Sequence, residues 1–221
     1  MPTMEAPARH VTKLQYAYST LRRAIIGCDL APGERVVIDD LARRFDISSI
    51  PVREALRILE SEGLVVSIPH VGTTVAPVSR QLIVEVFALL EGLETVSARA
   101  AAADGREDLS DLDELVARMD AALTAGKPET WAGLNTQFHL AISGRAGMPM
   151  VDQMLRRALD HWERVRRHFF SRMFTSRARA AQREHHTMLQ QLRKGDVDGI
   201  EKSMRVHNRE AMKAYTRYLD R

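Results

Sequence analysis

The chain has 221 residues, of which 45% are hydrophobic and 28% charged, a balance typical of globular proteins. A single cysteine cannot form a disulfide within the chain, which favours a reducing compartment, and we expect a cytoplasmic protein. The net charge of +3 permits nucleic-acid binding without establishing it. The best apolar stretch, residues 82–93, is interrupted by two glutamates, so no membrane-spanning helix and no membrane partner are expected.

Residues 1–78 show the element order of a winged helix-turn-helix. Residues 1–12 lack the apolar core of a signal peptide and are expected to form a flexible arm. Periodicity and turn residues then predict a helix over residues 13–27 capped by Thr12, a helix over 39–45, a helix capped by Ser48 that ends at Ser61, and a hairpin of strands 64–68 and 73–75. We expect a DNA-binding domain; the alternative is a small α+β domain that does not bind DNA.

Residues 79–221 contain no strand pattern and are expected to form an antiparallel all-helical bundle. Turns that contain Gly, Pro or Asp separate the segments with helical periodicity. The six predicted helices cover residues 80–103, 108–126, 130–144, 151–170, 176–194 and 197–219. The expected fold class is therefore mainly α, with an N-terminal winged helix-turn-helix followed by this bundle.

Two stretches of the chain resemble a known family. The sequence SSIPVREALRILESEGLV over residues 48–65, with LAPGER upstream and HVGTTV downstream, resembles the GntR family of bacterial transcription regulators. The helical remainder resembles the effector domain of the FadR-like subfamily, called FCD, through NTQFH at 135–139, Glu184-His185 and MRVH at 204–207. The resemblance implies a ligand-responsive transcription regulator that binds a double-stranded DNA operator and is not an enzyme.

The sequence departs from the family pattern at two places. The family commonly has Ser-Arg-Thr-Pro where this chain has Ser-Ser-Ile-Pro, so that Ser49 and Ile50 replace an arginine and a threonine. An apolar Ile50 favours contact with a thymine methyl group over a hydrogen bond to a base. In the first helix of the bundle, Phe87 stands where many relatives have an arginine, so an effector-binding arginine is not expected there.

The second helix of a helix-turn-helix places its N-terminal residues in the major groove. Arg53 is the best candidate for a contact to guanine or a phosphate, although it could instead pair with Glu54 or Glu60, and Ser48 could act only as a cap. The hairpin would reach the flanking backbone or minor groove. The predicted DNA-binding residues are Ser48, Ser49, Ile50, Pro51, Arg53, His70, Gly72 and Thr73.

Four residues of the bundle are candidate metal ligands. Asn135 and His139 are four apart and share one helix face, while His185 and His207 are equidistant from the predicted turn at residues 194–196 and should lie side by side. Three imidazoles and an amide oxygen suit a divalent transition metal; the alternative is a set of unrelated surface histidines. In many relatives the matching positions hold zinc, nickel or manganese, and the common ligand at position 135 is aspartate. The resemblance implies one of these ions here, with open positions for a small organic acid effector.

Two other functions remain open at this stage. One is a metal-dependent hydrolase tethered by the winged domain, and the other is a regulator that senses the metal itself. Glu184 is the only tempting general base, but neighbours on a helix diverge by about 100°, so it is expected to face away from the metal. The chain lacks HExxH and GxSxG motifs, and no catalytic residue is predicted. We expect a homodimer, formed through the helical domain, on an inverted-repeat operator.

The segment 156–183 holds nine arginines. A solvated helix face is the preferred interpretation, and a second nucleic-acid surface is the alternative. Trp131 and Trp162 are expected to pack the bundle rather than to line a ligand site.

Overall fold

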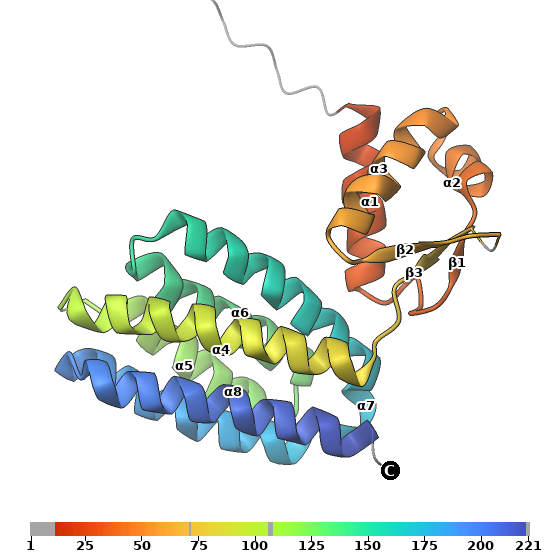
Figure 1. The fold of residues 1–221 in the computed structure, drawn as a ribbon. Helices are drawn as coiled ribbons and strands as arrows, with labels where there is room; N and C mark the ends of the chain where they lie inside the picture. The colour runs from red at the N-terminus through yellow and green to blue at the C-terminus, as the bar shows by residue number, and fades with distance from the viewer. Residues whose placement is uncertain (1–11, 71, 106–107, 220–221) are drawn as a thin grey trace, which may run out of the picture. The chain divides into compact units, whose positions relative to one another are not determined.

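The computed structural model describes residues 12–70, 72–105 and 108–219, except for the side chains of residues 170–176 and 218–219. The chain divides into two compact units, residues 1–78 and 79–221. The described part contains eight helices and three short strands, so the predicted fold class is confirmed (Figure 1). The arm predicted for residues 1–12 lies outside the described residues, apart from Thr12.

The N-terminal unit is a winged helix-turn-helix. Its elements are α1 (Lys13–Ile26), β1 (Arg35–Val36), α2 (Ile38–Phe45), α3 (Ser49–Ser61), β2 (Val65–Ile68) and β3 (Gly72–Val75). Thr12 begins α1 with a capping box, in which its hydroxyl accepts from the Gln15 N–H. The strands form an antiparallel sheet in the order β1-β3-β2. The two-residue strand β1 is not part of the sequence prediction, because a strand of that length has no readable alternation.

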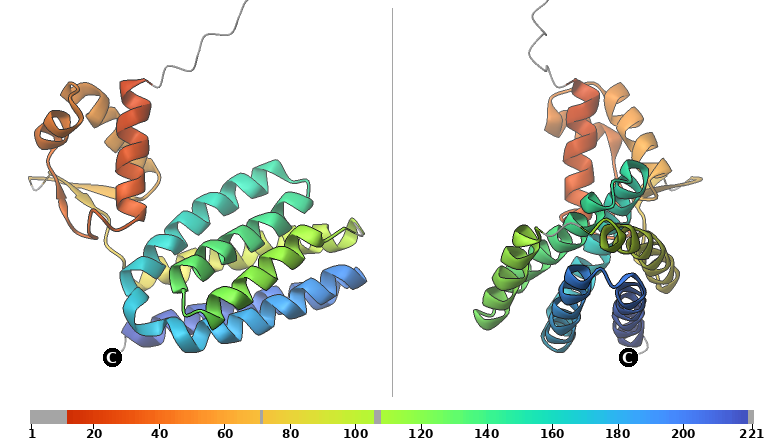
Figure 2. Two further views of the ribbon diagram at one scale, coloured as in Figure 1. Left: turned by 180° about the vertical axis from the view of Figure 1, so that it is seen from behind. Right: turned by 90° about the vertical axis from the view of Figure 1, so that its left-hand side faces the viewer.

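The C-terminal unit is an all-helical bundle formed by α4 (Arg80–Ala103), α5 (Ser110–Thr124), α6 (Pro128–Arg145), α7 (Pro149–Lys194) and α8 (Val197–Leu219). Helix α4 packs chiefly against α7 and α8, while α5 packs against α6 (Figure 2). A core of buried apolar side chains, including Leu112, Met119, Phe138, Met188 and Ile200, joins these helices. The left-handed conformation of Gly195 (φ 61°) ends α7 and allows α8 to fold back along it.

The prediction of two helices over residues 151–170 and 176–194 was wrong. The structure has one helix, α7, which changes direction part-way along its length instead of ending (Figure 2). The physical reason is that the intervening sequence SRMFT contains neither glycine nor proline, so nothing removes a backbone hydrogen bond or favours a left-handed stop. The two halves of α7 therefore supply side chains to the same pocket from different directions.

Candidate metal centre, effector pocket and DNA surface

Three buried histidines from three helices meet inside the bundle. His139 lies on α6, His185 on α7 and His207 on α8, and their ligand nitrogens all lie within 4.8 Å of one another. The ring centroids are 4.9–5.4 Å apart. The turn at Gly195 brings His185 and His207 to one level, and the close packing of α6 on α7 adds His139. The structure thus brings together three of the four predicted ligands as one cluster.

The outer nitrogens of these histidines face oxygen atoms. Nδ1 of His207 lies 2.6 Å from Oε2 of Glu184, and Nδ1 of His139 lies 3.1 Å from Oε1 of Glu94. Nδ1 of His185 lies 3.5 Å from Oε1 of Gln182. Metal-binding histidines usually have such an oxygen on the nitrogen that does not bind the ion, because it fixes the ring and its tautomer.

One histidine nitrogen of the cluster lacks a hydrogen-bond partner in the described part of the chain. His185 is fully buried, and within the described part of the chain its Nε2 has no hydrogen-bond partner. A buried polar atom without a partner is uncommon and points to a missing ligand or ion. Imidazole nitrogens are donors that divalent transition metals prefer, and Glu184 lies on the outer nitrogen of His207, so the residues present fit such an ion.

Electrostatics favour the neutral forms of His185 and His207 and the charged forms of the two carboxylates. Burial lowers the pKa of His185 well below its ordinary value, and it lowers the pKa of His207 as well. Burial alone would raise the pKa of Glu184, but His207 and Arg177 hold it at about 2. Burial would likewise raise the pKa of Glu94, which its polar neighbours, His139 first, lower below the usual range. Each ionised carboxylate can therefore support an imidazole that binds a cation.

Glu184 lies on the outer side of the cluster, as expected, but its side chain still contacts a proposed ligand. A rotation of about 100° per residue takes its side chain off the inner face of α7 but leaves it within reach of α8. There it contacts the outer nitrogen of His207 and accepts two hydrogen bonds of 2.7 Å from the guanidinium of Arg177. Glu184 therefore supports a ligand.

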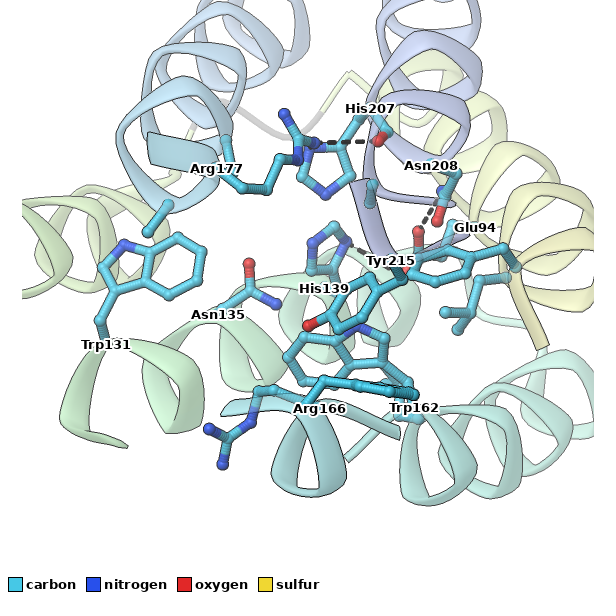
Figure 3. Close-up of a pocket in the computed structure, with 17 residues that line it drawn as sticks. Glu94, Trp131, Asn135, His139, Trp162, Arg166, Arg177, His207, Asn208 and Tyr215 are labelled. Atoms are coloured by element: carbon cyan, nitrogen blue, oxygen red, sulfur yellow. Dashed lines mark hydrogen bonds and ion pairs between the residues drawn. The ribbon is translucent and has the colours of Figure 1, made fainter. Parts of the chain in front are cut away.

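Asn135, the fourth predicted ligand, lies one helical turn before His139. Its side chain is buried and lines the same cavity (Figure 3). The structure brings Asn135 to the pocket beside the histidine cluster.

A cavity of about 70 Å³ adjoins the histidines. One part of its wall is polar, with Asn208 and Glu94 beside the histidines (Figure 3). Much of the remaining wall is apolar. The aromatic lining residues are Phe87, Trp131, Trp162, Phe169 and Tyr215, and the cationic ones are Arg166 and Arg177. The position at which many relatives have an arginine thus contributes an aromatic wall, with a ring-centroid distance of 5.6 Å between Phe87 and Tyr215.

Two sequence interpretations of this region hold only in part. The arginine-rich segment is not simply a solvated face, because Arg164 and Arg166 are buried and Arg177 is mostly so. Arg166 is neutralised by Glu163 and Glu129, at 2.7 Å from each. Trp131 and Trp162 do pack the bundle, but both also line the cavity. The i,i+3 spacing of Glu163 and Arg166 is the local signal that could have identified a buried ion pair.

The first turn of α3 presents the predicted DNA-reading residues. Ser48 is exposed at the N-cap and its side chain makes no capping hydrogen bond, so its hydroxyl is available. Ile50 is 67% exposed, while Ser49 and Pro51 are half-buried. Arg53 is exposed, and no ion pair to Glu54 or Glu60 occurs among the described residues; Glu60 instead accepts from the Ser67 N–H.

The hairpin carries the other three predicted DNA-binding residues. His70 and Gly72 are exposed and both have positive φ, 64° and 100°, whereas Thr73 is half-buried. Exposed Arg35 of β1 lies against this wing, because a Cβ at Gly72 would sit 3.8 Å from its guanidinium. Arg35 was not among the predicted contacts, although it stands in the LAPGER motif.

Comparison with known families decides what these two units are. The FCD domain family matches residues 85–210, and the family of bacterial regulatory proteins called gntR matches residues 14–75. The chain belongs to the GntR family and carries an FCD domain. The GntR-family regulator therefore joins a DNA-binding domain to an effector domain, as the resemblance of its sequence implied.

Relatives of this GntR-family protein are transcription regulators. The regulator McbR of Escherichia coli (strain K12) is 29% identical over 148 residues, which cover 66% of this chain and 67% of McbR. The transcriptional repressor RspR of the same strain is 26% identical over 197 residues, 89% of this chain and 86% of RspR. The prediction of a regulator rather than an enzyme is confirmed by these relatives.

A solved structure of E. coli McbR/YncC shares the fold. It has a TM-score of 0.76 and 24% identity, and the match covers 95% of this chain and 100% of that one. Over the described residues, none of the helices is both long and apolar enough to cross a membrane.

Proposed function

We propose that this regulator holds a divalent transition metal in its helical domain and uses it to recognise a small carboxylate effector. The ligands are His139, His185, His207 and the amide oxygen of Asn135. The observation that carries the proposal is the cluster of three buried imidazoles whose ligand nitrogens lie within 4.8 Å of one another. Zinc, nickel and manganese are the candidate ions, because nitrogen-rich sites with an added oxygen accept all three.

Effector binding rests on the position of the cavity. Asn135, His139 and His207 line it, so an ion held by them would face the space in which a small molecule lies. The Asn135 amide carries no charge, and the ion would add positive charge to this wall. A carboxylate suits this wall, because its oxygens can bind the ion and also accept hydrogen bonds from nearby donors.

The N-terminal domain is proposed to read the operator through α3 and the hairpin. Ser48, Ser49, Ile50, Pro51 and Arg53 would enter the major groove, and the wing residues His70, Gly72 and Thr73 would reach the flanking backbone. Support comes from exposed Ile50 and from Arg53, whose guanidinium is free of the intramolecular pairs considered above.

We further propose that the protein acts in the cytoplasm as a homodimer joined through residues 79–221, on an inverted-repeat operator. One winged helix covers few base pairs, so two half-sites related by the protein's two-fold axis supply the needed specificity. In this dimer the effector would change the spacing or orientation of the two DNA-binding domains, and with it their fit to the two half-sites.

Elemental analysis of purified protein, before and after loading with zinc, nickel or manganese, tests the metal site. We expect about one ion per chain, lost in His185→Ala. The matched control is His186→Ala, which changes the next residue, an exposed histidine paired with Asp120 at 3.0 Å. Wild type that binds none of the three ions refutes the proposal.

Gel shifts with the operator then separate an effector-responsive regulator from a metal sensor. We expect organic acids to change operator affinity only when the ion is present. If chelation alone switches DNA binding and no acid has an effect, the metal itself is the signal.

A further inference from the structure

We infer that the effector is a monocarboxylic acid with an aromatic or other hydrocarbon body, rather than a di- or tricarboxylic acid. The inference rests on the proposed function, because it takes the carboxylate to lie at the histidine cluster. The charges and the apolar side chains of the remaining cavity wall then determine which body the effector carries besides its carboxylate.

The two arginines of the wall are already neutralised. Arg166 donates to both oxygens of Glu163, at 2.8 and 2.7 Å, and to Glu129 at 2.7 Å. Arg177 makes a two-pronged contact with Glu184, at 2.7 Å for each bond, and also donates to the backbone oxygen of His207. A guanidinium that binds one or two carboxylates has little attraction left for another anion. The charge of each arginine is therefore largely compensated by glutamates of the chain, which weakens its attraction for a second carboxylate of the effector.

Acidic groups of the chain add to this selection. Glu94 lines the cavity, is almost fully buried and lies 3.1 Å from Nδ1 of His139. A second carboxylate, that of Glu184, lies behind His207. A bound ion compensates one effector carboxylate, whereas a second one would be buried close to like charge without a cation.

The rest of the wall is suited to hydrocarbon. Phe87, Tyr215 and Phe169 form a connected aromatic group, with centroid distances of 5.6 Å and 6.4 Å, and Trp162 lines the same cavity. At about 10–15 Å³ per water-sized group, 70 Å³ holds roughly five to seven such groups. That space fits a carboxylate with a short alkyl chain, whereas a ring requires the surrounding side chains to move apart.

The test uses the two tryptophans of the chain, Trp131 and Trp162, which both line the cavity and report binding by fluorescence. Zinc-loaded protein is titrated with benzoate, phenylacetate, 3-phenylpropanoate and hexanoate, and with malonate, succinate and citrate. Calorimetry repeats each titration. We expect the best monocarboxylate to bind at least about tenfold more tightly than the best of the other acids. The neutral analogue 3-phenylpropanol should bind far more weakly than 3-phenylpropanoate.

A variant tests the charge argument independently. Glu129→Gln removes one of the two carboxylates on Arg166 at a side chain that is 53% exposed. We expect succinate to bind about three- to tenfold more tightly to this variant, with little change for 3-phenylpropanoate. Glu114→Gln, at an exposed glutamate that pairs with Arg118 on the same helix, is the matched control and should change neither.

The outcomes distinguish the two levels of the proposal. Succinate or citrate that binds wild type as tightly as the best monocarboxylate, or better, overturns this inference and leaves the carboxylate effector intact. Unchanged succinate binding in Glu129→Gln refutes the argument from neutralised arginines. If the protein takes up zinc but none of the acids binds, the carboxylate effector and this inference fail together while the metal site stands.

Discussion

The contact between Glu184 and His207 gives a sharp prediction about metal affinity. Glu184→Gln keeps the size of the side chain but removes the negative charge that lies 2.6 Å from Nδ1 of His207. It also leaves the guanidinium of Arg177, which is 3.4 Å from the same nitrogen, without its charged partner. Both changes make His207 a poorer donor to a cation, so we expect the variant to bind metal more weakly.

Two observations bear on the size of this effect. The pKa of Glu184 falls from 4.5 to about 2 although burial opposes this, a net stabilisation of the charged form by about 3 kcal/mol at 1.36 kcal/mol per pKa unit. Loss of an outer carboxylate at a histidine ligand usually weakens metal binding by about 10- to 100-fold, or roughly 1.4–2.7 kcal/mol. We therefore expect a loss of about 10- to 100-fold for Glu184→Gln.

The assay is competition for zinc against a chelator of known affinity, at constant pH and salt. Glu210→Gln is the control, because this glutamate lies on α8 but pairs with Lys213 and not with a histidine. Circular dichroism verifies that each variant keeps its helices. Zinc affinity in Glu184→Gln within about twofold of wild type would show that the carboxylate does not act through His207.

Four further predictions concern DNA binding, assembly, charge and stability. Arg53→Ala should cost about 1–3 kcal/mol of operator affinity at fixed salt while leaving helical content unchanged, and equal affinity in a gel shift would remove this residue from the interface. Light scattering at micromolar concentration should show a dimer, and a monomer both with and without operator DNA would contradict the assembly. Asn135→Asp should tighten zinc binding but weaken acid binding in calorimetry, since charges about 4 Å apart interact by roughly 4 kcal/mol at an effective dielectric near 20; acid binding as tight as in wild type would contradict this. Glu163→Gln should destabilise the helical domain by about 1–3 kcal/mol in urea unfolding. In the wild type, burial would raise the pKa of Glu163, but Arg166 and Arg167 outweigh it and lower the pKa in the folded state. The stabilisation from this ion pair is therefore present above pH 4.5 and is lost as the pH falls below it. The variant should be less acid-sensitive than wild type, and an equal sensitivity would count against the ion pair.

The winged domain and most of the histidine cluster could be predicted from the sequence because their signals are local. Cap residues and turn glycines mark the ends of short helices. The position of Gly195 between His185 and His207 defines a hairpin, and an i,i+4 pair defines a shared helix face. Such patterns depend on a few neighbouring residues and survive tertiary packing.

The rest of the pocket could not be predicted because it depends on contacts between distant segments. Glu94 reaches His139 from another helix, and nothing in the sequence around it distinguishes a supporting carboxylate from a surface one. Arg166 is buried only because Glu129 of α6 joins Glu163 in neutralising it. The prediction of two helices in place of the long α7 failed differently, because the segment between them contains no glycine, proline or aspartate to end a helix.

The unpartnered Nε2 of His185 also bears on the lifetime of the protein in the cell. A buried polar atom without a partner costs about 1–3 kcal/mol, so the metal-free bundle carries a penalty that a bound ion would relieve. An ion held by His139, His185 and His207 would also tie α6 to the α7–α8 hairpin. At a free ion concentration a hundred times Kd, binding adds about 2.7 kcal/mol to the free energy of unfolding. A change of that size alters the unfolded fraction available to proteases about a hundredfold, so metal supply would set how much of the regulator persists.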